Sequence, residues 1–174
     1  MKVLDPSVVL SSSEEDTAAL GAFMARYAFP GLACLLEGDL GMGKTVLVRG
    51  FCGAAGCRRV RSPSFTLVNQ YPCTGPFSVV HADLFRIGEE DVRDLDLESF
   101  LEEGAVLFVE WAERWRTSGL ESVWIIRFSP GEGPGNRGRR IAFSARGERA
   151  EISLRDFLHG LEKEKNGEGI HFGD

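Results

Sequence analysis

The stretch that decides the fold is LACLLEGDLGMGKTVLVRGF, residues 32–51, in which an apolar run ends in a glycine-rich loop before a second apolar segment begins. The run over 32–37 is short and continuously apolar, which predicts a strand that is buried on both faces. Residues 44–56 predict a helix with Gly56 as its C-cap. A strand, a glycine loop and a helix in this order are the setting of a phosphate-binding loop.

The loop itself, GDLGMGKT, fits the pattern G-x-x-x-x-G-K-[ST]. Its glycines permit left-handed and crowded backbone conformations, so that the N–H groups of the loop can converge on phosphate oxygens. Lys44, which we expect to be exposed in the loop, supplies a charge for the β- and γ-phosphates, and Thr45 supplies a hydroxyl for Mg²⁺. The residues expected to bind ATP or ADP here are Gly38, Asp39, Leu40, Gly41, Met42, Gly43, Lys44 and Thr45.

A phosphate-binding loop needs a carboxylate for Mg²⁺, which is usually found where an apolar strand ends. Two segments offer one, because FSVVHAD ends in Asp83 and AVLFVE ends in Glu110. The residues alone leave the choice between them open. His81 lies on the same strand face as Asp83, and a buried His–Asp hydrogen bond is a simpler interpretation of this histidine than metal ligation.

The rest of the chain predicts further helices and strands around this unit. Ser12 and Glu15 have the spacing of a capping box at the start of a helix whose apolar face runs from Leu20 to Tyr27. The other expected elements are a β-hairpin over 66–71 and 77–87, an acidic helix over 89–104, a strand over 105–111, a second β-hairpin over 122–128 and 139–145, and a helix over 151–161. We expect one domain over residues 1–160 and a disordered polar tail over 161–174.

The composition indicates a globular protein and argues against several classes. The 174 residues are 43% hydrophobic and 26% charged, and no apolar run reaches the roughly 20 residues that span a bilayer. A net charge of −6 argues against a broad nucleic-acid-binding face. The N-terminus turns acidic too early for a signal peptide, so we expect a cytoplasmic protein without membrane contact. The cysteines Cys34, Cys52, Cys57 and Cys73 form no C-x-x-C pair, and we expect reduced thiols.

Two further segments carry polar groups whose role the residues leave open. RSPSF, residues 61–65, holds two serines where nucleotide switches sense a γ-phosphate, although an ordinary Ser-Pro turn is the simpler interpretation. Arg137, Arg139 and Arg140 lie in and after a glycine-rich hairpin loop, where they could reach a nucleotide or a partner or face solvent.

Four segments in this order resemble the bacterial TsaE (YjeE) family: GDLGMGKT, SPSFTLVNQY, HADLFR and EWAER. The corresponding family patterns are G-D-L-G-A-G-K-T, S-P-T-[FY]-T-L-V, H-x-D-L-Y-R and E-W-P, and the match extends over residues 11–160. The chain departs from them at Met42, Ser64, Phe85 and Ala112. Met42 offers the loop only its backbone and Ser64 keeps a hydroxyl, whereas Phe85 lacks the hydroxyl of the family's tyrosine and Ala112 relaxes the backbone after Trp111.

The resemblance implies an α/β fold with a single P-loop NTPase-like domain, whose mixed sheet is parallel in the centre and antiparallel at the flanks, with helices on both faces. It implies that Thr45 and Glu110 bind Mg²⁺ and that Asp83 is an essential carboxylate near the γ-phosphate, with Lys44 completing the catalytic set. The other residues that it implies near the nucleotide are Ser62, Ser64 and Thr66 of a switch loop, Trp111 and Arg137.

By the same resemblance, the protein hydrolyses ATP to ADP, weakly when alone, and resets a complex of a TsaD-type transferase and a TsaB-type companion. That complex transfers a threonylcarbamoyl group to tRNA adenosine, and tRNA would be reached only through it. Two alternatives stay open. One is a small-molecule kinase, for which residues 130–140 are the one candidate lid, and the other is a binding module that senses ATP without hydrolysing it.

Overall fold

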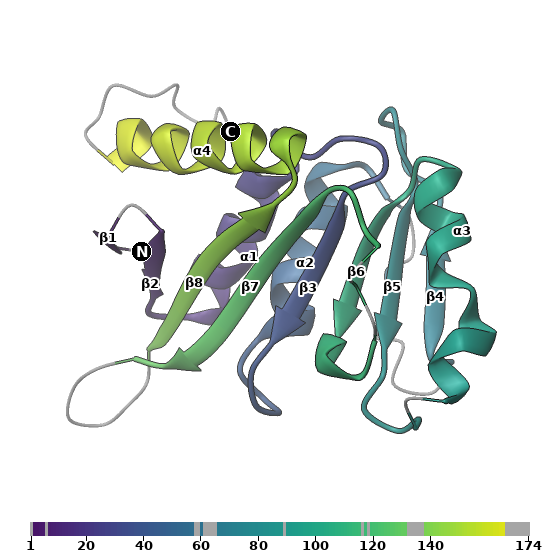
Figure 1. Cartoon of the computed structure of the whole chain (residues 1–174). Helices are drawn as coiled ribbons and strands as arrows, with labels where there is room; N and C mark the ends of the chain where they lie inside the picture. The colour runs from purple at the N-terminus through teal and green to yellow at the C-terminus, as the bar shows by residue number, and fades with distance from the viewer. Residues whose placement is uncertain are drawn as a thin grey trace.

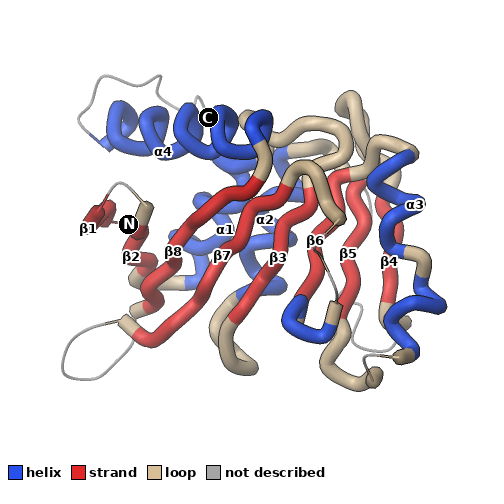
Figure 2. The backbone as a smooth tube through the Cα atoms, viewed as in Figure 1, coloured by secondary structure: helices blue, strands red, loops and turns tan. Residues whose placement is uncertain are grey.

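The structure is a computed structural model that describes residues 2–5, 7–57, 60, 66–88, 90–115, 117, 119–131 and 138–165. Its described residues form one eight-stranded sheet with the order β1-β2-β8-β7-β3-β6-β5-β4 (Figures 1 and 2). The strands are β1 (Lys2–Asp5), β2 (Val8–Ser11), β3 (Ala33–Glu37), β4 (Val68–Tyr71), β5 (Val79–Asp83), β6 (Val106–Glu110), β7 (Val123–Pro130) and β8 (Arg139–Arg146). The central strands β7, β3, β6 and β5 are parallel and the flanking pairs are antiparallel, which confirms the predicted fold class.

Helices cover both faces of this sheet (Figure 1). One face packs against α1 (Glu14–Met24), α2 (Lys44–Ala54) and α4 (Glu148–Lys165), and the other against α3 (Leu97–Glu102) and the 3₁₀ turns η1 (Asp91–Leu95) and η2 (Ala112–Arg114). Side chains of a strand alternate between the two faces, so Cys34 and Leu36 of β3 enter the first core whereas Ala33 and Leu35 enter the second. Both faces of β3 are therefore apolar, as its sequence predicts.

Two helical glycines let α1 and α2 approach closely. A Cβ on Gly21 of α1 would overlap the carbonyl oxygen of Leu47, and a Cβ on Gly50 of α2 would overlap the carbonyl oxygen of Ala18. Because α2 begins directly after the glycine loop, this contact fixes the helix that presents the loop.

The structure differs from the predicted elements in three places. Lys2–Asp5 and Val8–Ser11 form β1 and β2, which no pattern indicated; β1 pairs with β2, and β2 joins the sheet through the distant strand β8. The N-cap of α1 is Ser13, whose hydroxyl accepts from the N–H of Asp16, so the predicted Ser12–Glu15 capping box is wrong by one residue. The predicted helix over 89–104 is broken at Asp96, where φ is +45°, a left-handed conformation that no α-helix tolerates.

The last helix is longer than predicted. It extends from Glu148 to Lys165, so residues 161–165 belong to the folded domain rather than to the tail, whose other residues lie outside the described part. Leu161 is buried and continues the apolar face of α4 beyond residue 160. Within the described residues, no helix combines the length and the apolar character needed to cross a membrane.

The prediction of four reduced thiols is wrong for one pair of cysteines. Cys34 and Cys52 are free and buried, and burial raises the pKa of both thiols. Cys57 and Cys73, in contrast, form a disulfide. Cys57 follows the end of α2, and Cys73 lies 16 residues later, between β4 and β5. The spacing of the two cysteines in the sequence could not indicate that the fold brings them together.

Candidate active site

The glycine loop connects β3 to α2, as its sequence predicts. Gly38, Gly41 and Gly43 all have positive φ values, of +126°, +79° and +93°. At Gly38 a side chain is also excluded by space, because a Cβ would lie 2.5 Å from the carbonyl oxygen of Phe128 in β7. The loop therefore depends on glycine both for its conformation and for its fit against the neighbouring strand.

The N-terminus of α2 has no side-chain cap from its N-cap residue. Gly43 is its N-cap and offers no side chain, and its first turn contains no acidic residue. The first N–H groups of a helix and its positive dipole end favour an anion. The strand, loop and helix thus have the arrangement that the pattern predicts, with a helix N-terminus that favours an anion.

Lys44 is buried, which corrects the expectation that it lies exposed in the loop. Only 4% of this residue is accessible, and its Nζ donates to the carbonyl oxygens of Gly38 at 2.5 Å and Asp39 at 3.0 Å. The same atom lies 4.8 Å from the ring centroid of Trp111. Burial lowers the pKa of the ammonium group, and the carboxylates of Glu110 and Asp83 act in the opposite direction. The lysine therefore closes the loop on itself and faces the carboxylates of the site.

Glu110, the last residue of β6, contacts the start of α2. Its Oε1 accepts a hydrogen bond from Thr45 Oγ1 at 2.8 Å and lies 2.9 Å from His81 Nε2. Glu110 is 6% exposed. Burial raises the pKa of its carboxyl, but the hydrogen bonds from His81 and Thr45 and the charge of Lys44 outweigh this effect, so that its pKa lies below the ordinary value. The side chain is therefore a buried carboxylate tied to the helix that follows the loop.

His81 pairs with Glu110 and not with Asp83, so the predicted His–Asp hydrogen bond is wrong. Asp83 and Glu110 are opposite each other in the parallel pair β5–β6, and His81 lies two residues before Asp83. On one face of a sheet a diagonal neighbour on the next strand is within reach of a long side chain. Glu110 spans that distance, whereas the carboxylate of Asp83 accepts from the N–H of Phe85 at 3.0 Å. The other ring nitrogen of His81, Nδ1, is buried without a hydrogen-bond partner in the described part of the chain.

An aromatic and cationic cluster closes the site on the side of β5 and β6. The ring centroids of Trp111 and Phe85 are 4.9 Å apart, and Trp111 has a left-handed backbone with φ of +59°. Arg114 donates to the carbonyl oxygens of Leu84, Phe85 and Ile87. These bonds fix the segment that follows Asp83, and no sequence motif pointed to this role of Arg114.

The model of the family described as "Threonylcarbamoyl adenosine biosynthesis protein TsaE" matches residues 11–138. The chain belongs to the TsaE family. A relative from Bacillus subtilis (strain 168), named "tRNA threonylcarbamoyladenosine biosynthesis protein TsaE", is 35% identical over 140 residues, which cover 79% of this chain and 85% of the relative. A relative of the same name from Aquifex aeolicus is 40% identical over 109 residues, which cover 61% and 77%.

A solved structure agrees with this assignment. The crystal structure of Bacillus subtilis YdiB superposes with a TM-score of 0.69 at 26% identity, and the match covers 89% of this chain and 95% of YdiB. The resemblance to the TsaE family that four short motifs indicated is thereby confirmed.

Not every residue expected in a TsaE site is brought together. The loop, Lys44 and Thr45 meet Glu110, with Asp83 at the adjacent strand end and Trp111 beside Lys44. Thr66 is exposed and donates its hydroxyl hydrogen bond to Asn69 Oδ1 at 2.7 Å, so that its described contact is local. Ser62, Ser64 and Arg137 lie outside the described residues, and their expected roles stay predictions.

The donor set of this TsaE chain fits Mg²⁺ that arrives with a nucleotide. No group of three or more His, Cys, Asp or Glu residues that could hold a metal exists in the described segments. The available oxygen donors are the Thr45 hydroxyl and the Glu110 carboxylate, which are hydrogen-bonded to each other. Mg²⁺ is commonly held by one or two carboxylates together with substrate phosphates, and this small set matches that mode.

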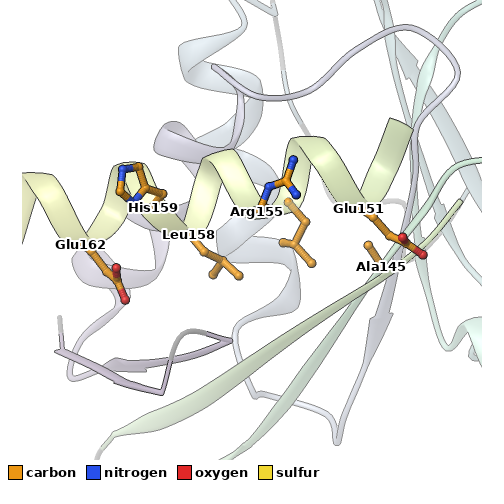
Figure 3. Close-up of a pocket in the computed structure, with 7 residues that line it drawn as sticks. Ala145, Glu151, Arg155, Leu158, His159 and Glu162 are labelled. Atoms are coloured by element: carbon orange, nitrogen blue, oxygen red, sulfur yellow. The ribbon is translucent and has the colours of Figure 1, made fainter. Parts of the chain in front are cut away.

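Two cavities of the described residues lie away from this site. A cavity of about 360 Å³ opens between α4 and β8, where Figure 3 shows Glu151, Arg155, His159 and Glu162 along the helix with Leu158 and Ala145 beside them. A second one, of about 630 Å³, is lined by residues that include Phe29, Glu98 and Arg149. None of these residues belongs to the loop or to the strand ends that carry the carboxylates, so these two cavities are separate from the candidate site.

Proposed function

We propose that this chain is a Mg²⁺-dependent ATPase that hydrolyses ATP to ADP in the biosynthesis of tRNA threonylcarbamoyladenosine, the process named in its family. The observation that carries the proposal is the 2.8 Å hydrogen bond between Thr45 Oγ1 and Glu110 Oε1. It joins the first turn after the phosphate-binding loop to a buried strand-end carboxylate, which is the pairing that nucleoside triphosphate hydrolysis requires.

Each residue has a distinct task in this proposal. The N–H groups of the loop and of the first turn of α2 bind the phosphates. The ammonium group of Lys44 exchanges its hydrogen bonds to the Gly38 and Asp39 carbonyls for hydrogen bonds to the β- and γ-phosphates. A bound Mg²⁺, held by Thr45 and Glu110, would offset the charge of the phosphate oxygens. Asp83 lies at the adjacent strand end, where its carboxylate can accept a hydrogen bond from the attacking water and orient it.

The hairpin between β7 and β8 favours hydrolysis over a kinase reaction. Its strands stay paired up to Pro130 and Arg139, so the ends of the candidate lid over 130–140 are held in the sheet. P-loop kinases close a larger mobile segment over an acceptor pocket, because water must be excluded from phosphoryl transfer. Neither of the two cavities described above adjoins the loop, and the acceptor in this proposal is water.

The proposed partners are a TsaD-type transferase and a TsaB-type companion, and hydrolysis resets their complex between rounds of tRNA modification. The chain has 26 acidic and 20 basic residues, and each tRNA phosphate that a protein binds needs a cation. We therefore expect tRNA to be reached through these proteins and not by this chain alone.

The test is an ATPase assay of the chain with and without the two partner proteins and tRNA, in which ADP and free phosphate are measured. The expected result is slow turnover alone and clearly faster turnover with the partners. ADP formed together with a phosphorylated small molecule would replace the proposal with the kinase. ATP binding without ADP formation, even with all partners present, would replace it with a non-hydrolysing binding module.

A further inference from the structure

Arg139, the first residue of β8, lies against the last glycine of the phosphate-binding loop. A Cβ on Gly43 would be 2.9 Å from Arg139 Nε, 3.3 Å from its Cδ and 3.5 Å from its Cζ. The guanidinium group is thus in contact with the N-cap of α2, although about 100 residues of sequence separate the two. The positive φ of Gly43 favours glycine here, and a Cβ at this position would also displace the arginine side chain.

The charge of Arg139 lies at the positive end of a helix. Its side chain is 15% exposed and contacts the N-cap of α2, where the helix dipole is also positive, so this place favours an anion between them. The ion pair that it makes in the described part of the chain is with Glu14 Oε1, at 3.9 Å, and Glu14 is 70% exposed. Such long and exposed pairs contribute little, so Glu14 does not by itself account for an arginine at this place.

The order of the strands determines which end of a nucleotide Arg139 can meet. Glu110 and Asp83 lie at the ends of β6 and β5, on one side of β3, and these carboxylates belong to the terminal phosphate in the proposed reaction. Arg139 comes from β8, on the other side of β3. A phosphate chain that lies in the loop with its terminal phosphate toward Glu110 therefore has its inner phosphate toward Arg139.

We infer that Arg139 binds the α-phosphate of the nucleotide and so sets the affinity for ADP and ATP alike. The inference rests on the proposed function, and it adds a residue that neither the loop pattern nor the strand-end carboxylates include. A guanidinium group can donate two parallel hydrogen bonds to phosphate oxygens, which a lysine cannot reproduce. Glu14 Oε1, 3.9 Å from the guanidinium group, is the carboxylate that a phosphate would displace.

The test compares Arg139→Ala, Arg139→Lys and Arg140→Ala by calorimetric titration with ADP and with ATP. Arg140 is the matched control, because neighbouring residues of a strand point to opposite faces and Arg139 shares the face of Ile141, which packs in the core with α1 and α2. A hydrogen bond to a charged group is worth about 1.5–3 kcal/mol, so we expect Arg139→Ala to weaken both nucleotides by about 10- to 100-fold. Arg139→Lys should recover part of this loss and Arg140→Ala should bind like the unmodified chain.

A second variant tests the competition that the geometry implies. In Glu14→Gln the guanidinium group is released from its carboxylate, so the affinity for ADP should rise about two- to threefold, which a purely structural role of Arg139 would not produce. Unchanged ADP affinity in a folded Arg139→Ala would overturn the inference, as would a loss confined to ATP, which would place Arg139 at the γ-phosphate. Lys44→Ala distinguishes failure of the inference about Arg139 from failure of the proposed function, because unchanged ADP binding in Lys44→Ala would refute the proposed function itself.

Discussion

At the scale of single residues, the lysine of the loop behaves differently from an ordinary surface lysine. Lys44 is buried, and its ammonium group bridges the carbonyl oxygens of Gly38 and Asp39 above the ring of Trp111. These contacts close the loop on itself. In the proposed function, a bound nucleotide would replace the two carbonyl acceptors with phosphate oxygens, which are charged and therefore better acceptors.

Lys44→Ala should reduce the affinity for ADP by at least about 100-fold, because the charge opposite the phosphates is lost. The free energy of unfolding should fall by about 1–2 kcal/mol, since two hydrogen bonds from a buried charged donor disappear while the cost of burying that charge is also removed. Calorimetric titration and denaturant unfolding measure the two effects. ADP affinity equal to that of the unmodified chain would contradict the assignment of the loop.

Glu110→Gln should retain nucleotide binding and lose hydrolysis. The amide keeps an oxygen that can accept from Thr45 and His81, so the local hydrogen bonds survive, but it carries no charge for Mg²⁺. ADP affinity should change by less than about threefold, whereas ATP turnover with partners should fall by at least about 100-fold. Glu113→Gln, an exposed residue nearby, is the control and should hydrolyse ATP normally. Normal turnover of Glu110→Gln would move the metal role to Asp83.

At the scale of elements, the loop is presented by a helix whose position depends on one close contact. Gly50 of α2 lies against the backbone of Ala18, and Gly21 of α1 lies against the backbone of Leu47. Helices approach this closely only where no side chain separates their backbones. Gly53, three residues after Gly50 in the same helix, is exposed and has nothing within 4 Å of an added Cβ.

Gly50→Ala and Gly53→Ala should therefore change stability in opposite directions. Alanine at position 50 forces α1 and α2 apart and should lower the free energy of unfolding by about 1–3 kcal/mol. Alanine at position 53 favours the helix without a clash and should raise it by about 0.5–1 kcal/mol. Thermal and denaturant unfolding of both variants decide this. If both variants changed the free energy of unfolding equally, α1 and α2 would lie farther apart than the close contact at Gly50 indicates.

The disulfide links the end of α2 to the turn before β5, and its contribution can be measured separately. Cys57 and Cys73 close a segment of 16 residues, for which the chain-entropy estimate is about 3 kcal/mol. The double variant Cys57→Ala/Cys73→Ala should lose about that much stability relative to the oxidised chain. The double variant Cys34→Ala/Cys52→Ala changes the core and keeps the disulfide. A reducing agent should therefore lower its stability by the same amount as it lowers that of the unmodified chain. Identical stability of the oxidised and reduced chain would contradict a structural bond.

At the scale of the whole molecule, the candidate site is assembled from segments that are far apart in the sequence. The loop follows β3, the carboxylates end β5 and β6, and Arg139 begins β8. These strands belong to one continuous sheet, so movement of one edge can be transmitted to the loop through paired backbones. The proposed function requires a structural connection of this kind between the nucleotide site and the surface that contacts the partner proteins.

Asp83→Ala should dock onto the transferase pair in the presence of ATP and fail to support repeated rounds of modification. The loop, Lys44 and Glu110 remain to bind the nucleotide, and only the carboxylate proposed to orient water is removed. The measurement is a time course of modified tRNA with the partners in limiting amount, in which one round per complex is expected. Many rounds per complex would show that hydrolysis is not the reset step.

The amino-acid sequence alone determined the features that depend on neighbouring residues. The loop Gly38–Thr45, the buried strand before it, the helix after it and both hairpins follow from local patterns, and the two-residue period of a strand places His81 and Asp83 on one face. Short-range geometry fixes these features, and the family motifs consist of the same local segments.

Only the tertiary structure decided the features that depend on which strands become neighbours. It joined Thr45 and His81 to Glu110, buried Lys44, placed Arg139 on Gly43 and paired Cys57 with Cys73. The pairing of β2 with β8 belongs to the same class. The physical reason is that each of these contacts closes a long loop, and its free energy comes from packing and hydrogen bonds between distant segments, which local propensity does not encode.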